Sequence, residues 1–135
     1  MRFVLDASVA TCWFFEDEHN ARADAAAAIL LASGSAIAPL IFWFELRNVV
    51  MMGVRRGRAS EASMLQGLAT TMRATISLDT LPSDDAIFSL AKRHRLTFYD
   101  AAYLELAQRE GIALATLDQA LARAATAEGV PLIGA

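Results

Sequence analysis

Residues 96–125, LTFYDAAYLELAQREGIALATLDQALARAA, predict a helix, a strand and the start of a second helix in direct succession. Asp100 opens the first helical pattern and Gly111 closes it, as glycine commonly does at a helix end. The apolar run 112–116 is typical of a short buried strand, and Asp118 precedes the next helix. Because alternating helices and strands build layered proteins, this stretch predicts an α/β fold with a parallel sheet.

The same alternation extends from this stretch to both ends of the chain. Further strands are expected at residues 2–5, 35–38, 74–81 and 130–133. Further helices are expected at residues 8–15, 18–33, 60–72, 84–95 and 119–129, and one more beginning at Pro39 and running to Gly57. The order predicts a mainly parallel sheet with helices on both faces.

Length and composition favour one domain spanning residues 1–135, because no linker or repeat divides the chain. No apolar run approaches the roughly 18 residues that span a bilayer, so no membrane partner is expected. The first strand segment carries Asp6 and is too short and too acidic for a signal peptide. Cys12 is the single cysteine, which favours a reducing, cytoplasmic location.

The formal net charge of −3 argues against a protein that binds nucleic acid through a broadly basic surface. Two local basic clusters stand out, RRGR at 55–58 and KRHR at 92–95. Each is compatible with a solvated helix end, where cations suit the helix dipole, and equally with phosphate contact through arginine. The arginines considered for RNA contact are Arg55, Arg56 and Arg93.

Three aspartates lie where a predicted strand meets a helix: Asp6, Asp100 and Asp118. Ligand sites of doubly wound sheets lie beyond the carboxyl ends of the strands, so these junctions direct the three side chains toward one edge. Each residue has an alternative interpretation as a helix N-cap, which is stronger for Asp118 than for Asp6. Glu18 and Asp79 also lie at junctions and are interpreted as surface residues.

Glu45 lies well inside the predicted helix of residues 39–57, so it has no capping role. Its helical neighbours three and four residues away are apolar except Asn48, an amide that hydrogen-bonds carboxylates or water. This pattern indicates a glutamate that faces a polar pocket. The alternative is a side chain that extends off the helix flank beside Arg47.

Convergence of these four acids would require a compensating charge. Two carboxylates about 4 Å apart repel by roughly 4 kcal/mol at an effective dielectric constant near 20. A divalent cation relieves that repulsion, and oxygen ligands favour Mg²⁺ or Mn²⁺ over zinc. His19 and His94 have no partner at zinc-ligand spacing. The sequence therefore predicts hard-cation chemistry, in which such ions activate water and cleave phosphodiesters.

Three motifs in order resemble those of PIN-domain ribonucleases, especially the VapC-type toxins of bacterial toxin–antitoxin pairs. They are FVLDASVATCWFFEDE at 3–18, APLIFWFELRNVV at 38–50 and the stretch at 96–125. The resemblance places the family's acidic quartet on Asp6, Glu45, Asp100 and Asp118. It places the accessory polar positions on Ser8, Asn48 and Thr116.

The resemblance implies a three-layer α/β/α sandwich and an Mg²⁺- or Mn²⁺-dependent endoribonuclease that cuts tRNA or ribosomal RNA, leaving a 5′-phosphate and a 3′-hydroxyl. It also implies a cognate antitoxin that blocks the site, and frequent homodimers. The aromatic run WFF at 13–15 fits such a partner, because no helix buries three consecutive rings on one stripe. We expect Trp13 or Phe14 to help line the antitoxin groove.

Three other functions are considered beside a nuclease. A phosphatase with an aspartyl nucleophile wants a second aspartate two residues after Asp6, where the chain has Ser8. A response-regulator receiver wants a late lysine, but Lys92 precedes the third acid. A catalytically inert module that binds RNA or protein is the remaining alternative. The acidic quartet argues against it, because uncompensated negative charge repels RNA.

Overall fold

The computed structural model describes residues 1–135, and its centre is a four-stranded parallel sheet with strand order β3-β2-β1-β4. The strands are β1 Arg2–Leu5, β2 Ser35–Pro39, β3 Ile76–Asp79 and β4 Ala113–Ala115. In the register of the sheet, Val4 lies between Ile37 of β2 and Leu114 of β4. The expected α/β fold with a parallel sheet is confirmed. None of the helices combines the length and the apolarity that crossing a bilayer requires.

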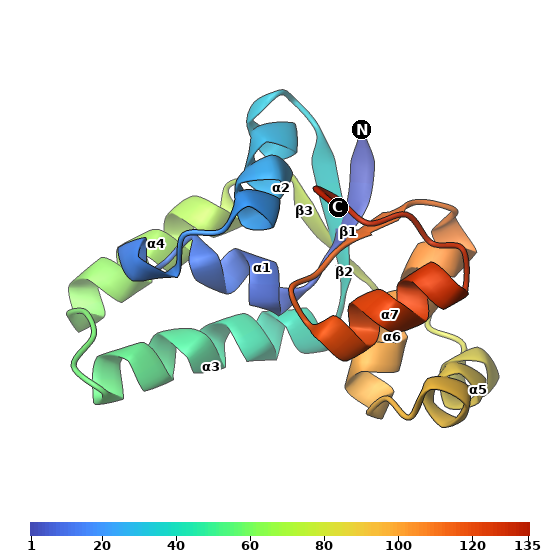
Figure 1. Cartoon of the computed structure of the whole chain (residues 1–135). Helices are drawn as coiled ribbons and strands as arrows, with labels where there is room; N and C mark the ends of the chain where they lie inside the picture. The colour runs from blue at the N-terminus through green and yellow to red at the C-terminus, as the bar shows by residue number, and fades with distance from the viewer.

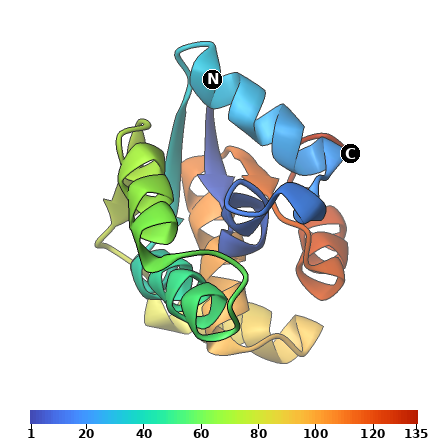
Figure 2. The ribbon, with the colours of Figure 1, turned by 90° about the vertical axis from the view of Figure 1, so that its left-hand side faces the viewer.

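Seven α-helices cover the two faces of this sheet, as Figure 1 shows. They are α1 Ala7–Cys12, α2 Ala21–Leu31, α3 Ile41–Arg55, α4 Glu61–Met72, α5 Asp84–His94, α6 Phe98–Glu110 and α7 Gln119–Ala127, with a 3₁₀ turn, η1, at Glu16–Glu18. Helices α1 to α4 lie on one side, where α3 and α4 form a hairpin (Figure 2), and α5 to α7 lie on the other. The three-layer α/β/α arrangement is therefore as expected.

Side-chain caps explain where most helices begin. Asn20, Ser60 and Ser83 each accept a hydrogen bond from a backbone N–H of the first helical turn, which satisfies donors that otherwise lack partners. At the other end of α6, Gly111 adopts the left-handed conformation at φ 64°. Ser60, Ser83 and Gly111 were predicted from the sequence, whereas the helix expected at residues 18–33 begins only at Ala21, after its cap Asn20.

Several expected boundaries were wrong. Pro39 ends β2 rather than opening a helix, and α3 begins at Ile41. Helix α1 ends at Cys12, so the aromatic run follows the helix instead of continuing it. The stretch 130–133 is not a strand, because only Leu132 forms an isolated bridge, to Leu114.

The path of the chain through the sheet changes direction at one point, between β1 and β4. From β1 the chain moves outward to β2 and β3 with helices on one face, then returns past β1 to β4 with α5 and α6 on the other face. The winding direction therefore reverses between β1 and β4. Crevices at the carboxyl ends of strands beside such a reversal are the usual ligand sites of α/β sheets.

Candidate functional site

A polar pocket of about 330 Å³ lies at the carboxyl ends of β1 and β4. The structure brings the four predicted acids together there, although they come from four separate segments of the chain. The pocket is lined by Asp6, Ala7, Ser8, Thr11, Glu45, Asn48, Val49, Asp100 and Asp118. The site thus occupies the point where the winding of the sheet reverses.

Asp6, directly after β1, is 4% exposed and is held by two hydroxyl groups. Ser8 Oγ and Thr116 Oγ1 both donate to Asp6 Oδ2, each at 2.7 Å. The two hydroxyls also accept, since the backbone N–H of Leu117 donates to Ser8 and that of Asp118 donates to Thr116. This network ties the junction after β1 to the junction after β4 and orients the Asp6 carboxylate.

Glu45 is half-buried on α3, and its partner is a tyrosine that the sequence reasoning did not single out. Tyr103 Oη donates to Glu45 Oε1 at 2.7 Å. The spacing of Tyr103 three residues after Asp100, on the same helical face, was the available signal. Arg47 does not pair with Glu45; its guanidinium lies over the Trp43 ring, 3.7 Å from the ring centroid.

Asp100 and Asp118 differ in their relation to the helices they precede or join. Asp100 does not follow a strand as expected, because α6 comes directly after α5 in the chain. Asp100 is the third residue of α6 and not its cap; Thr97 takes that role and accepts from the Asp100 backbone N–H. Asp118 is the N-cap of α7, and its Oδ1 accepts from the backbone N–H of Leu121 at 2.8 Å. The capping interpretation is therefore correct for Asp118, which still lines the pocket.

Burial and mutual repulsion make ionisation of the carboxyl groups in this pocket less favourable. Burial is the main cause that raises the pKa of Asp6, and the nearby charge of Asp118 raises it further. The pKa of Glu45 is raised by burial and by Asp6 and Asp100, against the hydrogen bond from Tyr103. The pKa of Asp100 is raised by burial and by Asp118 and Asp6. No cationic side chain lines the pocket.

The donor atoms of the pocket fit a hard divalent cation, because they are carboxylate, amide and hydroxyl oxygens. Asp6, Glu45 and Asp118 each use one carboxylate oxygen in a hydrogen bond and leave the other without a protein partner. No group of three or more His, Cys, Asp or Glu side chains is arranged as a ready-made ion cage. Repulsion between carboxylates disfavours such close approach.

The three arginines considered for RNA contact lie outside the pocket. Arg55 and Arg56 are exposed at the end of α3, where a rise of about 1.5 Å per residue puts Arg55 about 15 Å beyond Glu45. Arg93 is paired with Glu128 at 2.7 Å, at the far end of α7 from Asp118. The structure therefore does not gather these arginines beside the acids.

A separate groove of about 460 Å³ runs between α2 and α4. Trp13 lines it, and its indole Nε1 donates to the backbone carbonyl of Ala23. Leu31, which is 88% exposed, lies on the same groove. Phe14 lines a neighbouring hollow beside Arg58 instead of this groove. The aromatic run thus divides between two surface depressions.

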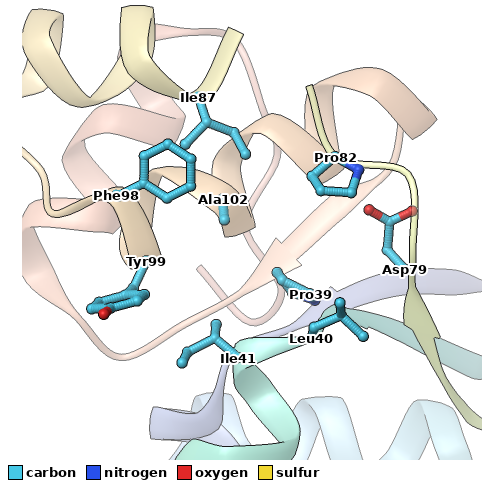
Figure 3. A pocket seen from close by; sticks show the side chains of 9 residues that line it. All are labelled: Pro39, Leu40, Ile41, Asp79, Pro82, Ile87, Phe98, Tyr99 and Ala102. Carbon is cyan, nitrogen blue, oxygen red and sulfur yellow. The ribbon is translucent and has the colours of Figure 1, made fainter. Parts of the chain in front are cut away.

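A narrow apolar cleft of about 170 Å³ separates the first turns of α3 and α6 from the loop before α5 (Figure 3). Asp79 lies at one end of it, and its interpretation as a surface residue was wrong. The Asp79 side chain is 9% exposed, and Oδ2 accepts from Arg109 Nη2 at 2.7 Å. Hydrogen bonds from Arg109 lower the pKa of Asp79.

The fold and the pocket together define an α/β protein with an acidic site at the reversal point of its sheet. The sequence matches the PIN domain family over residues 3–127. Ribonuclease VapC3 of Pyrobaculum aerophilum is 32% identical over 126 residues, which cover 90% of this chain and 93% of that relative. The chain therefore belongs to the PIN domain family, as the motifs predict.

Solved structures show the same fold. PAE2754 from Pyrobaculum aerophilum superposes with a TM-score of 0.74 at 22% identity, covering 98% of this chain and 83% of that chain. VapBC2 from Rickettsia felis, bound to a DNA fragment from their promoter, gives a TM-score of 0.70 at 12% identity over 98% of this chain and 97% of that chain. At these identities the likeness concerns the fold alone.

Proposed function

We propose that this protein is a divalent-metal-dependent endoribonuclease, the toxin of a toxin–antitoxin pair, and that residues 1–135 act as one PIN-like domain in the cytoplasm. The observation that carries the proposal is the pocket itself: four carboxylates meet where α/β proteins bind ligands, with no cation of the protein's own. Membership of the PIN domain family and the relative named Ribonuclease VapC3 support the same activity.

Asp6, Glu45, Asp100 and Asp118 would hold one or two Mg²⁺ or Mn²⁺ ions. A bound cation of this kind supplies Lewis-acid activation of water and stabilises charge on the oxygens of the scissile phosphate. Ser8 and Thr116 hold the Asp6 carboxylate in place, and the cap of α7 holds Asp118. Asn48 is exposed at the pocket and offers an amide donor to water or to substrate oxygens.

The experiment is RNA cleavage by the wild-type protein and by Asp100→Asn, with Mg²⁺ or Mn²⁺ and with chelator. We expect chelator to abolish cleavage and Asp100→Asn to lower kcat/KM at least about a thousandfold, since several kcal/mol of transition-state stabilisation are lost. Asp85→Asn, an exposed change on α5, is the matched control and keeps activity. RNA binding without metal-dependent cleavage would instead favour the inert binding module.

The antitoxin is proposed to occupy the groove between α2 and α4. The groove is open, mostly lined by small and apolar side chains, and bordered by Trp13 and the exposed Leu31. We expect Trp13→Ser combined with Phe14→Ser, which removes one ring from this groove and one from the neighbouring hollow, to weaken antitoxin binding. Leu31→Ser tests the same groove with little risk to folding, because Leu31 is already exposed. Unchanged affinity in folded variants would remove the groove from the interface.

A homodimer is proposed through the exposed apolar side chains near the cleft of Figure 3. Leu40 lines this cleft, Phe44 lies one helical turn further along α3, and Leu81 and Phe88 are next in the chain to the lining residues Pro82 and Ile87. The four side chains are 50%, 64%, 77% and 58% exposed in that order. Large exposed apolar side chains beside an apolar cleft are typical of an interaction site. We expect sedimentation to show a dimer that Phe44→Ser combined with Phe88→Ser converts to a monomer. A monomeric wild-type protein would contradict this.

The RNA substrate is proposed to be tRNA or ribosomal RNA, with Arg55 and Arg56 contacting phosphates beyond the cleavage site. Their exposure leaves both guanidinium groups accessible. Replacing both with alanine is expected to raise KM and flatten its salt dependence while kcat is kept. Arg93→Ala is the comparison, because its partner Glu128 already engages that guanidinium. Sequencing of RNA ends after brief induction would identify the cleaved RNA.

A further inference from the structure

Helix α6 sends two side chains toward the acidic pocket from the same face. Asp100 lines the pocket, and Tyr103 follows three residues later. The Tyr103 side chain is fully buried, with no exposed surface, so its ring is fixed by the core. Its hydroxyl donates to Glu45 Oε1 on α3 at 2.7 Å. The rigid, buried hydroxyl of Tyr103 therefore donates to one carboxylate of the pocket.

Glu45 depends on this contact more than Asp6 depends on any single donor. Asp6 Oδ2 receives two hydroxyl donors, whereas Glu45 receives one hydrogen bond, from Tyr103. A glutamate has three side-chain torsions, and ordering them costs conformational entropy. Anchoring Oε1 restricts those torsions and leaves Oε2 as the oxygen without a protein partner.

We propose that Tyr103 is a positioning residue: its buried hydroxyl holds Glu45 so that the free Oε2 is presented to a divalent cation in the pocket. The inference rests on the proposed metal-dependent function and adds the group that orients one of its ligands. Hydrogen-bond partners of metal ligands commonly contribute about 10- to 100-fold to metal affinity or activity. Tyr103 makes that contribution without touching the ion.

The test is the affinity for Mn²⁺ alone, measured by electron paramagnetic resonance or calorimetry in the absence of RNA. Tyr103→Phe keeps the ring in its buried place and removes only the donor, and we expect it to weaken Mn²⁺ binding about tenfold. Tyr99→Phe is the matched control, because Tyr99 is the other tyrosine and its hydroxyl is exposed without a side-chain partner. We expect Tyr99→Phe to keep the wild-type affinity.

A double-mutant cycle separates positioning from a general structural role. In a Glu45→Ala background the further change Tyr103→Phe is expected to have no effect on Mn²⁺ affinity, because the group it positions is absent. A tenfold loss that persists in that background, or equal affinity of Tyr103→Phe and the wild type, would overturn the inference. If the wild-type protein itself bound no Mn²⁺, the proposed metal site would fail first and this inference with it.

Discussion

Two groups of carboxylates in this chain differ in whether a cationic side chain pairs with them. In the first, Asp79 and Glu105 are nearly buried, with side chains 9% and 4% exposed, and Arg109 donates to both. In the second, the four acids of the pocket meet without any cationic side chain. The pKa of Asp79 is lowered and the pKa values of Asp6, Glu45 and Asp100 are raised.

The difference separates a structural cluster from a functional one. Asp79 and Glu105 share the positive charge of Arg109, and the pairing of Arg109 with Asp79 fastens β3 to α6. Carboxylates left uncompensated raise the free energy of the folded protein, and a cation from solution relieves that repulsion. Active sites are commonly kept at such a cost in stability. Three predictions test this contrast.

The largest effect on stability is expected when Asp79 and Glu105 lose the cation that pairs with them, Arg109. Arg109→Met keeps the apolar stem and leaves the nearly buried Asp79 and Glu105 without a cationic partner, so we expect the free energy of unfolding to fall by about 3 kcal/mol. Chemical denaturation measures it. Arg2→Met is the control, because the carboxylate that it leaves unpaired, Glu110, is 30% exposed and the ion pair is worth less than about 1 kcal/mol. Equal losses in the two variants would contradict the contrast.

A smaller effect of opposite sign is expected in the pocket. Asp100→Asn removes one repelling charge, so we expect the metal-free protein to gain roughly 0.5–2 kcal/mol while it loses activity. Denaturation in chelator measures the gain. Asp85→Asn is not expected to stabilise, because Asp85 lies in the first turn of α5 and suits the helix dipole. A destabilised Asp100→Asn would show that its charge is already compensated.

The pH dependence of stability is expected to have opposite signs in the two clusters. The raised pKa of Asp100 means that the folded metal-free protein binds this proton more tightly than the unfolded chain does, so its stability falls as pH rises through the raised pKa. The lowered pKa of Asp79 means that its contribution is present above the ordinary value of 3.8 and is lost as pH falls through the folded pKa.

Denaturation of three proteins at a series of pH values measures this. The stability advantage of Asp100→Asn over the wild type is expected to grow from acidic to neutral pH. The deficit of Asp79→Asn is expected to shrink toward acidic pH. Parallel curves for the wild type and Asp100→Asn would mean that Asp100 titrates alike in the folded and unfolded states.

The contrast between the two groups of carboxylates also explains which site residues could be predicted from the sequence. Strand ends and helix caps are local, and the fold class constrains where they meet, so Asp6, Asp100 and Asp118 were predicted to converge. Glu45 was recognised because it is a carboxylate on an otherwise apolar helical face. These residues are identified by residue type and position within one segment of the chain.

What sequence reasoning missed depends on partners distant in the chain. Asp79 and Arg109 are 30 residues apart, and Tyr103 and Glu45 are 58 residues apart. Nothing in the segment around Asp79 distinguishes a paired aspartate from a solvated one. The spacing from Asp100 places Tyr103 on the same helical face, but it does not identify the distant Glu45 as its hydrogen-bond partner. The short stretch around Leu132 was misjudged because pairing to the sheet, and not composition, decides whether an apolar run is a strand.

The most direct measurement is the free energy of unfolding as a function of Mn²⁺ concentration for the wild type, Asp100→Asn and Asp79→Asn. A cation that binds only the folded wild-type protein adds about 2.7 kcal/mol at a hundred times its dissociation constant. We expect that gain in the wild type and in Asp79→Asn, and a much smaller one in Asp100→Asn. Equal curves for Asp100→Asn and the wild type, or no gain in any of the three, would contradict the assignment of the acidic pocket as a metal-dependent site.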